Sequence, residues 1–202
     1  MAAKTAQKAK KKPAPRAAIK RPGSGAARKA ASSKAPGKTA ARPAGARSGS
    51  QVEKRMHEIG IVLPAIAPPV ANYIPFVRTG KLVFISGQIT LENGVPQFLG
   101  KLGRDYTIED GQRAARVCAL NVVAQLKAAC GGNLDKVKRC VRIGGFVNST
   151  PDFVDQPKVM NGASNLLVEI FGEDGKHART AVGVNTLPWG VAVEVEALFE
   201  LR

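Results

Sequence analysis

The first 50 residues contain no aspartate, no glutamate and no aromatic residue. Their only large apolar side chains are Met1 and Ile19, whereas 14 of the chain's 31 lysines and arginines fall within them. A segment of this composition cannot bury enough apolar surface to offset the entropy lost on ordering. We therefore predict that residues 1–55 form a disordered basic tail and that residues 56–202 form a folded domain.

The formal net charge of +16 belongs almost entirely to this tail. Residues 51–202 hold the other 17 lysines and arginines against all 15 acidic residues, which leaves a net charge of +2. Lysine-rich arms neutralise phosphates without reading sequence, so nucleic acid or another polyanion is one interpretation of the tail. A solubilising segment, a transit peptide and a translation start placed upstream of Met56 are the alternatives.

Cysteine and histidine are scarce, with three and two residues respectively. Cys118, Cys130 and Cys140 are too few and too irregularly spaced for a disulfide framework or a zinc site, which predicts buried thiols in a reducing, cytoplasmic compartment. His57 and His177 are far apart and have no third ligand at a recognisable spacing, so we expect neither a metal nor a cofactor. No run of ~18 apolar residues is present, so we expect no membrane span.

Short apolar runs and helical periodicities alternate along the predicted domain. The capping-box-like Thr107-Ile-Glu-Asp precedes apolar residues at helical spacing, and Gly131-Gly132 marks the end of that helix. Three prolines within residues 60–72 favour an extended lead-in, and residues 89–106 favour a loop with a short strand. The remaining predictions are a hairpin of residues 73–79 and 82–88, a strand at 137–148, a helix at 157–171, and strands at 179–186 and 191–201.

The resulting order ββαβαββ predicts an α+β fold in which two helices cover one face of a sheet. Val191, Val193 and Val195 alternate in the last strand with residues of the opposite face, among them Glu194. The second face of the sheet is therefore polar in part. We expect it to be either solvated or buried against another subunit.

The last two strands carry the clearest functional signal. Arg179 opens the first of them, and Glu194 lies on the polar face of the other. A guanidinium fork binds a carboxylate in a bidentate manner, which lysine does not do, and a nearby carboxylate can activate a water molecule. These two residues predict a site for a small organic acid.

The chain resembles the YjgF/RidA family over about residues 58–202. The resemblance rests on an ordered set of short segments, namely Ile85-Ser86-Gly87-Gln88, Gly131-Gly132, Phe146-Val147-Asn148, and the closing Arg179, Leu187-Pro188 and Val193-Glu-Val-Glu-Ala. It is strongest to the longer branch of the family, which carries the labels endoribonuclease-like and chorismate-mutase-like. Compared with short members, this chain has the proline-rich stretch 60–72 and extra residues around 95–105.

The resemblance implies a chorismate-mutase-like fold, a homotrimer, and small-molecule sites in the clefts between subunits. It further implies hydrolysis of reactive enamines and imines, such as 2-aminoacrylate, to 2-keto acids and ammonia. By motif position, Arg179 matches the arginine that binds the substrate carboxylate, and Glu194 matches the carboxylate that positions or activates water. The remaining matches are contact residues of the cleft: Tyr73, Ser86, Gly87 and Asn161.

Two other functional classes stay open at this stage. The same cleft suits a ligand-sensing trimer that performs no turnover. The family label and the basic tail suggest RNA binding or cleavage, although RNA cleavage without a metal needs an acid and a base near neutral pKa, and neither histidine has an evident partner. Chorismate mutase chemistry requires several cations around a dianion, and only Arg179 and Arg78 offer themselves.

Overall fold

The computed structural model describes residues 50–66 and 73–202. Five strands form one sheet in the order β1-β2-β7-β5-β6, and two short strands form a separate hairpin. The strands of the sheet are β1 (Phe76–Thr79), β2 (Leu82–Ile89), β5 (Val137–Asn148), β6 (Ala178–Val184) and β7 (Val193–Leu201); the hairpin is β3 (Leu91–Glu92) and β4 (Val95–Pro96); the α-helices are α1 (Gln51–Glu58), α2 (Ile108–Ala129) and α3 (Gln156–Phe171).

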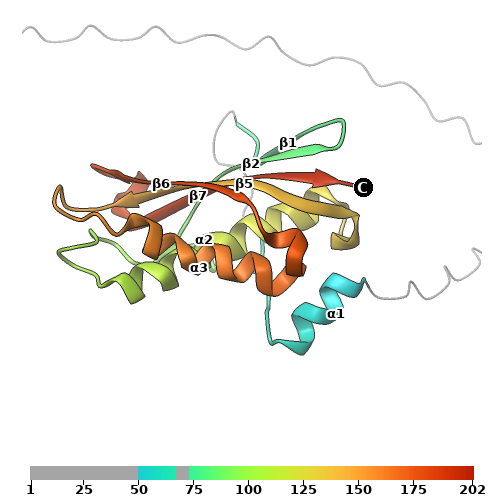
Figure 1. Cartoon of the computed structure of the whole chain (residues 1–202), viewed down its shortest axis with the longest axis horizontal. Helices are drawn as coiled ribbons and strands as arrows, with labels where there is room; N and C mark the ends of the chain where they lie inside the picture. Colours follow the sequence, from blue (N-terminus) through green and yellow to red (C-terminus); the bar gives the residue numbers. More distant parts are fainter. Residues whose placement is uncertain (1–49, 67–72) are drawn as a thin grey trace, which may run out of the picture. The chain divides into compact units, whose positions relative to one another are not determined.

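The α+β fold and its ββαβαββ order are confirmed (Figure 1). Strand β7 lies in the middle of the sheet and pairs antiparallel with both β2 and β5. Strand β6 is at one edge and runs parallel to β5, to which α3 forms the crossover connection. This arrangement leaves β1 at the other edge, so the predicted hairpin of β1 and β2 frames one side of the sheet.

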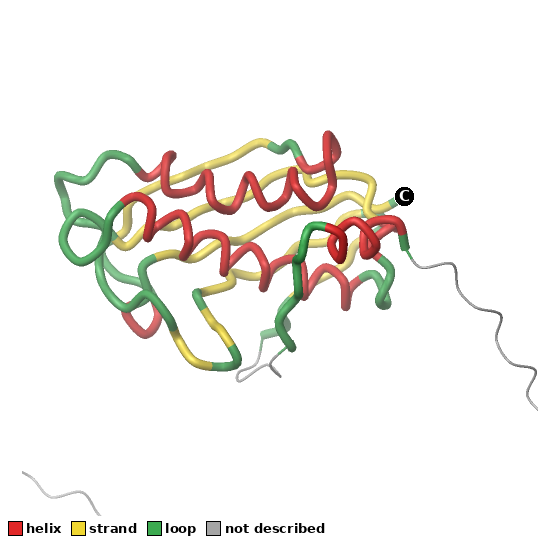
Figure 2. The backbone as a smooth tube through the Cα atoms, turned by 90° about the horizontal axis from the view of Figure 1, so that it is seen from below, coloured by secondary structure: helices red, strands yellow, loops and turns green. Residues whose placement is uncertain are grey.

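Both long helices cover the same face of the sheet, as predicted (Figure 2). Helix α2 begins with a complete capping box between Thr107 and Asp110, and α3 ends at Gly172, whose φ of 64° favours glycine. The inward residues of β7 are buried beneath the helices, whereas Glu194 and Glu196 on the alternate positions are half-buried. We refer to the face that α2 and α3 do not cover as the open face.

Some elements differ from the sequence-based prediction. The predicted loop 89–106 contains the β3–β4 hairpin, and β7 begins at Val193 because Val191 forms a bridge with Leu99 of that loop. A Cβ at Gly145 of β5 would collide with Met160 of α3, so close approach of the helix explains this glycine.

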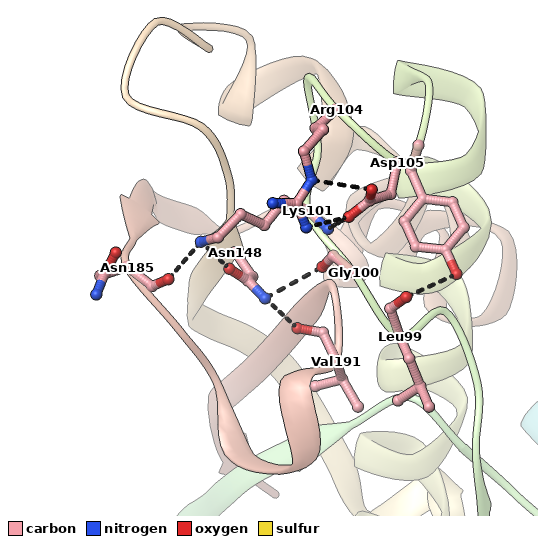
Figure 3. A network of polar contacts seen from close by, with 9 residues as sticks. Leu99, Gly100, Lys101, Arg104, Asp105, Asn148, Asn185 and Val191 are labelled. Atoms are coloured by element: carbon pink, nitrogen blue, oxygen red, sulfur yellow. Dashed lines mark hydrogen bonds and ion pairs between the residues drawn. The ribbon is translucent and has the colours of Figure 1, made fainter.

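A polar network holds the loop that follows β4 against the ends of β5 and β6 (Figure 3). The buried Asn148 amide donates to the carbonyls of Gly100 and Val191, both at 3.1 Å. Its Oδ1 accepts from Lys101 Nζ at 2.7 Å, and the same ammonium also contacts the Asn185 carbonyl. All polar atoms of the Asn148 side chain are thus satisfied within the protein, which marks this network as structural.

Helix α1 was not predicted, and the expected boundary between residues 55 and 56 falls inside it. The helix is joined to the domain through the carboxylate of Asp135, which accepts hydrogen bonds from Ser50 Oγ and from the Gln51 and Val52 amides at 2.8–3.0 Å. Hydrogen bonding to exposed amides at a helix N-terminus is a well-defined stabilising interaction. The rest of the predicted tail, residues 1–49, lies outside the described residues, as do residues 67–72 of the predicted lead-in.

We predict that the attachment of α1 depends on the charge of Asp135. Burial raises the pKa of this carboxyl, but the hydrogen bonds from Val52, Ser50 and Gln51, with the charge of Arg202, bring it below its ordinary value. Because the folded-state pKa is depressed, the stabilisation is complete above the unfolded value of about 4 and is lost as pH falls through the folded pKa. The protection of the α1 amides against hydrogen exchange, taken relative to the intrinsic exchange rate at each pH, is therefore expected to decrease at acidic pH.

Asp135→Asn should accelerate the same exchange roughly fivefold at neutral pH, since such capping contacts contribute about 1 kcal/mol. Asp174→Asn, at another acidic residue near Arg202, is the matched control and should leave α1 unchanged. Equal acceleration in both variants would contradict the role of Asp135.

No α-helix in the described part of the chain is long and apolar enough to cross a membrane.

Candidate functional site

Arg179 lies on β6, and its guanidinium turns toward α3, on the helix side of the sheet. Its Nη1 donates to Asn161 Oδ1 and to Ser164 Oγ, both at 3.0 Å, and its Nη2 donates to the Pro157 carbonyl at 3.0 Å. The side chain is nevertheless exposed, because β6 is an edge strand. The predicted pair Arg179 and Asn161 is therefore brought together, with a guanidinium held in a fixed orientation at the surface.

His177 contacts the Ser164 hydroxyl to which Arg179 donates. His177 Nε2 lies 3.1 Å from Ser164 Oγ, and His177 Nδ1 lies 2.7 Å from the Gly175 carbonyl oxygen. Burial lowers the pKa of His177, the Gly175 contact raises it, and the charge of Arg179 lowers it, with a net decrease. The sequence did not predict this contact, because Ser164 lies on α3 and His177 precedes β6. The one signal in the sequence was the position of Ser164, about one helical turn after Asn161.

Glu194 lies on β7 and points to the open face, because the residues that flank it, Val193 and Val195, are buried under the helices. Its carboxyl is half-buried, and this desolvation raises its pKa, to which the neighbouring Glu196 adds by like-charge repulsion. A carboxylate with a raised pKa is better suited to exchange protons near neutral pH.

The register of β2 against β7 shifts at the predicted Ser86 and Gly87, which fall between the pairs Ile85–Ala197 and Gln88–Val195. A Cβ at Gly87 would overlap Glu194 Oε1, so the Glu194 carboxylate occupies space that a side chain at position 87 would fill. Ser86 Oγ donates to the Ile74 carbonyl at 2.9 Å and thereby fixes the segment next to the exposed Tyr73. These residues form one group with Glu194.

We predict that Gly87→Ala displaces the Glu194 carboxylate without unfolding the protein, because the colliding atom is the end of a side chain that can rotate. If Glu194 activates water, kcat should fall by roughly 100-fold, the lower end of the range for a general base, with little change in KM. Ala128→Gly on α2 is the control for a general loss of stability. Gly94→Ala is unsuitable as a control because Gly94 has a positive φ, at which an alanine would be strained. An unchanged kcat in Gly87→Ala would contradict this reading of Gly87.

Within one chain, the two groups do not meet. Arg179 and Asn161 lie on the helix side of an edge strand, whereas Glu194, Gly87 and Ser86 belong to the open face. Strand β5 separates β6 from β7. A molecule that contacts both Arg179 and Glu194 therefore requires residues from two copies of the chain.

The open face also carries a groove of about 290 Å³. Ser86 lines it, together with Arg142, Gly144 and Glu196. A Cβ at Gly144 would collide with the Glu196 carboxylate, so Glu196 is positioned by a glycine in the same way as Glu194. The alternation of β7 places the two glutamates on one face, but it did not indicate that Glu196 and Arg142 share a groove.

The described residues contain no cluster of three or more histidine, cysteine, aspartate or glutamate side chains suited to a metal ion. Cys118, Cys130 and Cys140 are all buried and free, as predicted. Burial raises the pKa of the Cys118 thiol and raises that of Cys140 to about 12. Such thiols are poor nucleophiles at neutral pH.

Comparison with known proteins identifies relatives that match most of the folded part. The chain is 48% identical to protein TCP17 of Trypanosoma cruzi over 156 residues, which span 77% of this chain and 97% of TCP17. The crystal structure of Atu1372 from Agrobacterium tumefaciens, a protein of unknown function, superposes with a TM-score of 0.69 at 46% identity and covers 75% of this chain and 93% of its own. That of a "putative endoribonuclease" from Shewanella oneidensis superposes with a TM-score of 0.71 at 37% identity and covers 74% and 99%.

A family model also matches residues 53–200, and its description is "YjgF/chorismate mutase-like, putative endoribonuclease". This match takes in α2, α3 and the five-stranded sheet except Leu201, the last residue of β7, and with them every residue of the two groups described above. The chain therefore belongs to the YjgF/RidA family, as its sequence motifs predicted.

Proposed function

We propose that this protein hydrolyses small enamines or imines that carry a carboxylate, and that it releases a 2-keto acid and ammonia. The observation that carries the proposal is the state of Arg179, an exposed guanidinium held by three hydrogen bonds. Such a group is arranged in advance to bind a carboxylate. Membership of the YjgF/RidA family supports the same chemistry.

The site is proposed to form between subunits of a homotrimer, where the open face of one copy meets β6 of the next. Three apolar side chains of the open face support this: Val77 is 50% exposed, Phe84 46% and Val182 41%. The strand register places all three on the same face as Glu194. Contiguous exposed apolar surface is typical of a protein interface. The interface would bring Glu194 of one copy to Arg179 of another.

In this site, Arg179 would hold the substrate carboxylate while a water molecule attacks the imine carbon. Glu194 would accept a proton from that water as the carbon–oxygen bond forms and would return it to the nitrogen. In the resulting carbinolamine, Glu194 would take the hydroxyl proton and pass it to the amino nitrogen; the carbon–nitrogen bond then breaks, the carbonyl forms, and ammonia leaves. An imine is already electrophilic, so orientation and one proton-transfer group are enough for this reaction.

The direct test is release of 2-keto acid from 2-aminoacrylate generated enzymatically in the assay. The full chain is expected to accelerate hydrolysis well above the rate in buffer, without added metal. A rate equal to buffer, with pyruvate still raising the melting temperature, would replace the proposal with ligand sensing without turnover. No effect in either measurement would reject both functions.

A further inference from the structure

A chain of three hydrogen bonds runs from Arg179 into the protein. Arg179 Nη1 donates to Ser164 Oγ, Ser164 Oγ contacts His177 Nε2, and His177 Nδ1 contacts the Gly175 carbonyl oxygen. Ser164 and His177 are both half-buried. The hydrolysis proposed above requires neither residue. Because both are connected by hydrogen bonds to the arginine proposed to bind the carboxylate, they can affect how an anion binds there.

The chemistry of the four groups fixes the direction of each hydrogen bond. The Gly175 carbonyl can only accept, so His177 Nδ1 carries a hydrogen. In the neutral imidazole Nε2 is then an acceptor, and Ser164 must donate its one hydrogen to it. The Ser164 oxygen accepts from Arg179. With His177 neutral, therefore, the Ser164 hydroxyl has no hydrogen to offer to an anion at Arg179.

A second proton on His177 reverses the middle bond of this chain. The imidazolium Nε2 donates to Ser164, and the hydroxyl hydrogen becomes free to point toward the surface where Arg179 is exposed. A carboxylate there would receive hydrogen bonds from the guanidinium and from the hydroxyl, with an additional positive charge behind them. Bonds to an ionised acceptor are roughly twice as strong as neutral ones, so the change is substantial.

We propose that Ser164 is a further acid-binding residue of this site and that His177 is the positioning residue that directs its hydroxyl. Binding of a carboxylate at Arg179 is then accompanied by uptake of a proton at His177. The inference rests on the acid-binding role of Arg179 in the proposed function, but it does not depend on turnover.

The charges around His177 favour this coupling. No ion pair with His177 occurs within residues 50–66 and 73–202, and burial together with Arg179 keeps the ring neutral at pH 7. Other charged groups on the elements packed against it already have partners: Lys176 with Glu173, Asp174 with Arg202, Lys158 with Asp155, Glu169 with Arg116, and Arg142 with Thr180. A bound carboxylate supplies a negative charge at the end of the hydrogen-bond chain and raises the pKa of His177.

The sign of the pH dependence follows from this shift. Because the acid-bound form has the higher pKa, binding is strongest below the pKa of the free protein and weakens as pH rises through the pKa of the complex. A shift of about one pKa unit corresponds to a roughly tenfold loss of affinity across this range.

The test is calorimetric titration of the full chain with pyruvate, at several pH values between about 5.5 and 8, in buffers of different ionisation enthalpy. The wild type is expected to take up a substantial fraction of one proton per pyruvate and to bind roughly tenfold more weakly at the upper end. Ser164→Ala and His177→Gln are expected to bind with little proton uptake. His57→Gln removes the other histidine, which is exposed on α1, and should behave as the wild type.

Proton magnetic resonance of the His177 ring gives a second measurement that needs only the wild type. Pyruvate should raise the pKa of His177. Binding without proton uptake, or uptake that persists in His177→Gln, would overturn this inference and leave the acid-binding role of Arg179 intact. A wild type that binds no pyruvate would overturn both.

Discussion

Arg179→Ala protein is expected to hydrolyse 2-aminoacrylate at least about 100-fold more slowly than the wild type, because it loses a charge-assisted, bidentate contact worth roughly 3 kcal/mol. Arg179→Lys should recover only a small part of the rate, since an ammonium lacks the planar fork and cannot make the same bonds to Asn161, Ser164 and Pro157. The measurement is kcat/KM for 2-keto acid release. A rate in Arg179→Ala within twofold of the wild type would reject the site.

Glu194→Gln protein should also hydrolyse 2-aminoacrylate more slowly than the wild type. Combining it with Arg179→Ala protein should restore part of the activity. Arg179 and Glu194 lie on different faces of the sheet, so in the proposed site the arginine comes from one copy and the glutamate from another. When equal amounts of the two variants are denatured and refolded together, about a quarter of the interfaces receive both residues. Mixing should therefore restore activity to a comparable fraction of the wild type.

The refolded single variants are the controls for this experiment, and each should stay inactive. Mixing without denaturation tests whether subunits exchange. If co-refolded variants show no more activity than either alone, while co-refolded wild type is active, the two residues do not share a site between copies.

Gly162→Ala is expected to lower the stability of the domain by about 2 kcal/mol or more, an overpacking penalty within the usual range. Gly162 lies on α3 where the helix meets α2, and a Cβ there would overlap the backbone carbonyl of Gln112. A backbone atom cannot rotate away, so the helices must separate. For a domain of this size the loss corresponds to a fall of roughly 4–8 °C in melting temperature.

Asn165→Ala is the matched control, since it introduces the same residue at an exposed position of the same helix. Alanine is a better helix former than either glycine or asparagine, so helix propensity alone would make both variants more stable. Thermal unfolding followed by circular dichroism separates the two effects. A melting temperature of Gly162→Ala equal to or above that of Asn165→Ala would show that the helices tolerate the added methyl group.

The sequence predicted those parts of the fold that depend on local signals. The capping box at Thr107, the glycine that ends α3 and the alternation of β7 each act within a few residues, and the structure confirms them. Helix α1 also has a local signal, since Ser50 caps it by accepting from the Glu53 amide, but the helix is short and follows the basic segment directly, so it was not predicted. Its stabilising partner, Asp135, is distant in sequence and becomes evident only when the carboxylate is seen beneath the helix N-terminus.

The same distinction between local signals and long-range contacts applies to the candidate site. Arg179 and Glu194 could be named from their strands, and their roles remain predictions. Their separation onto opposite faces could not be foreseen, because it depends on β6 pairing parallel with β5 at the edge while β7 occupies the centre. The contact between Ser164 and His177 likewise depends on how α3 packs against the start of β6.

The parallel pairing of β5 with β6 has a consequence for the order of folding. The arginine group is contained in one continuous stretch, β5–α3–β6, whereas the glutamate group requires the N-terminal β2 to find the C-terminal β7. Contacts between distant parts of a chain form more slowly than local ones. A nascent chain can thus complete the group around Arg179 before the last strand has been synthesised, and it gains the group around Glu194 only at the end of translation.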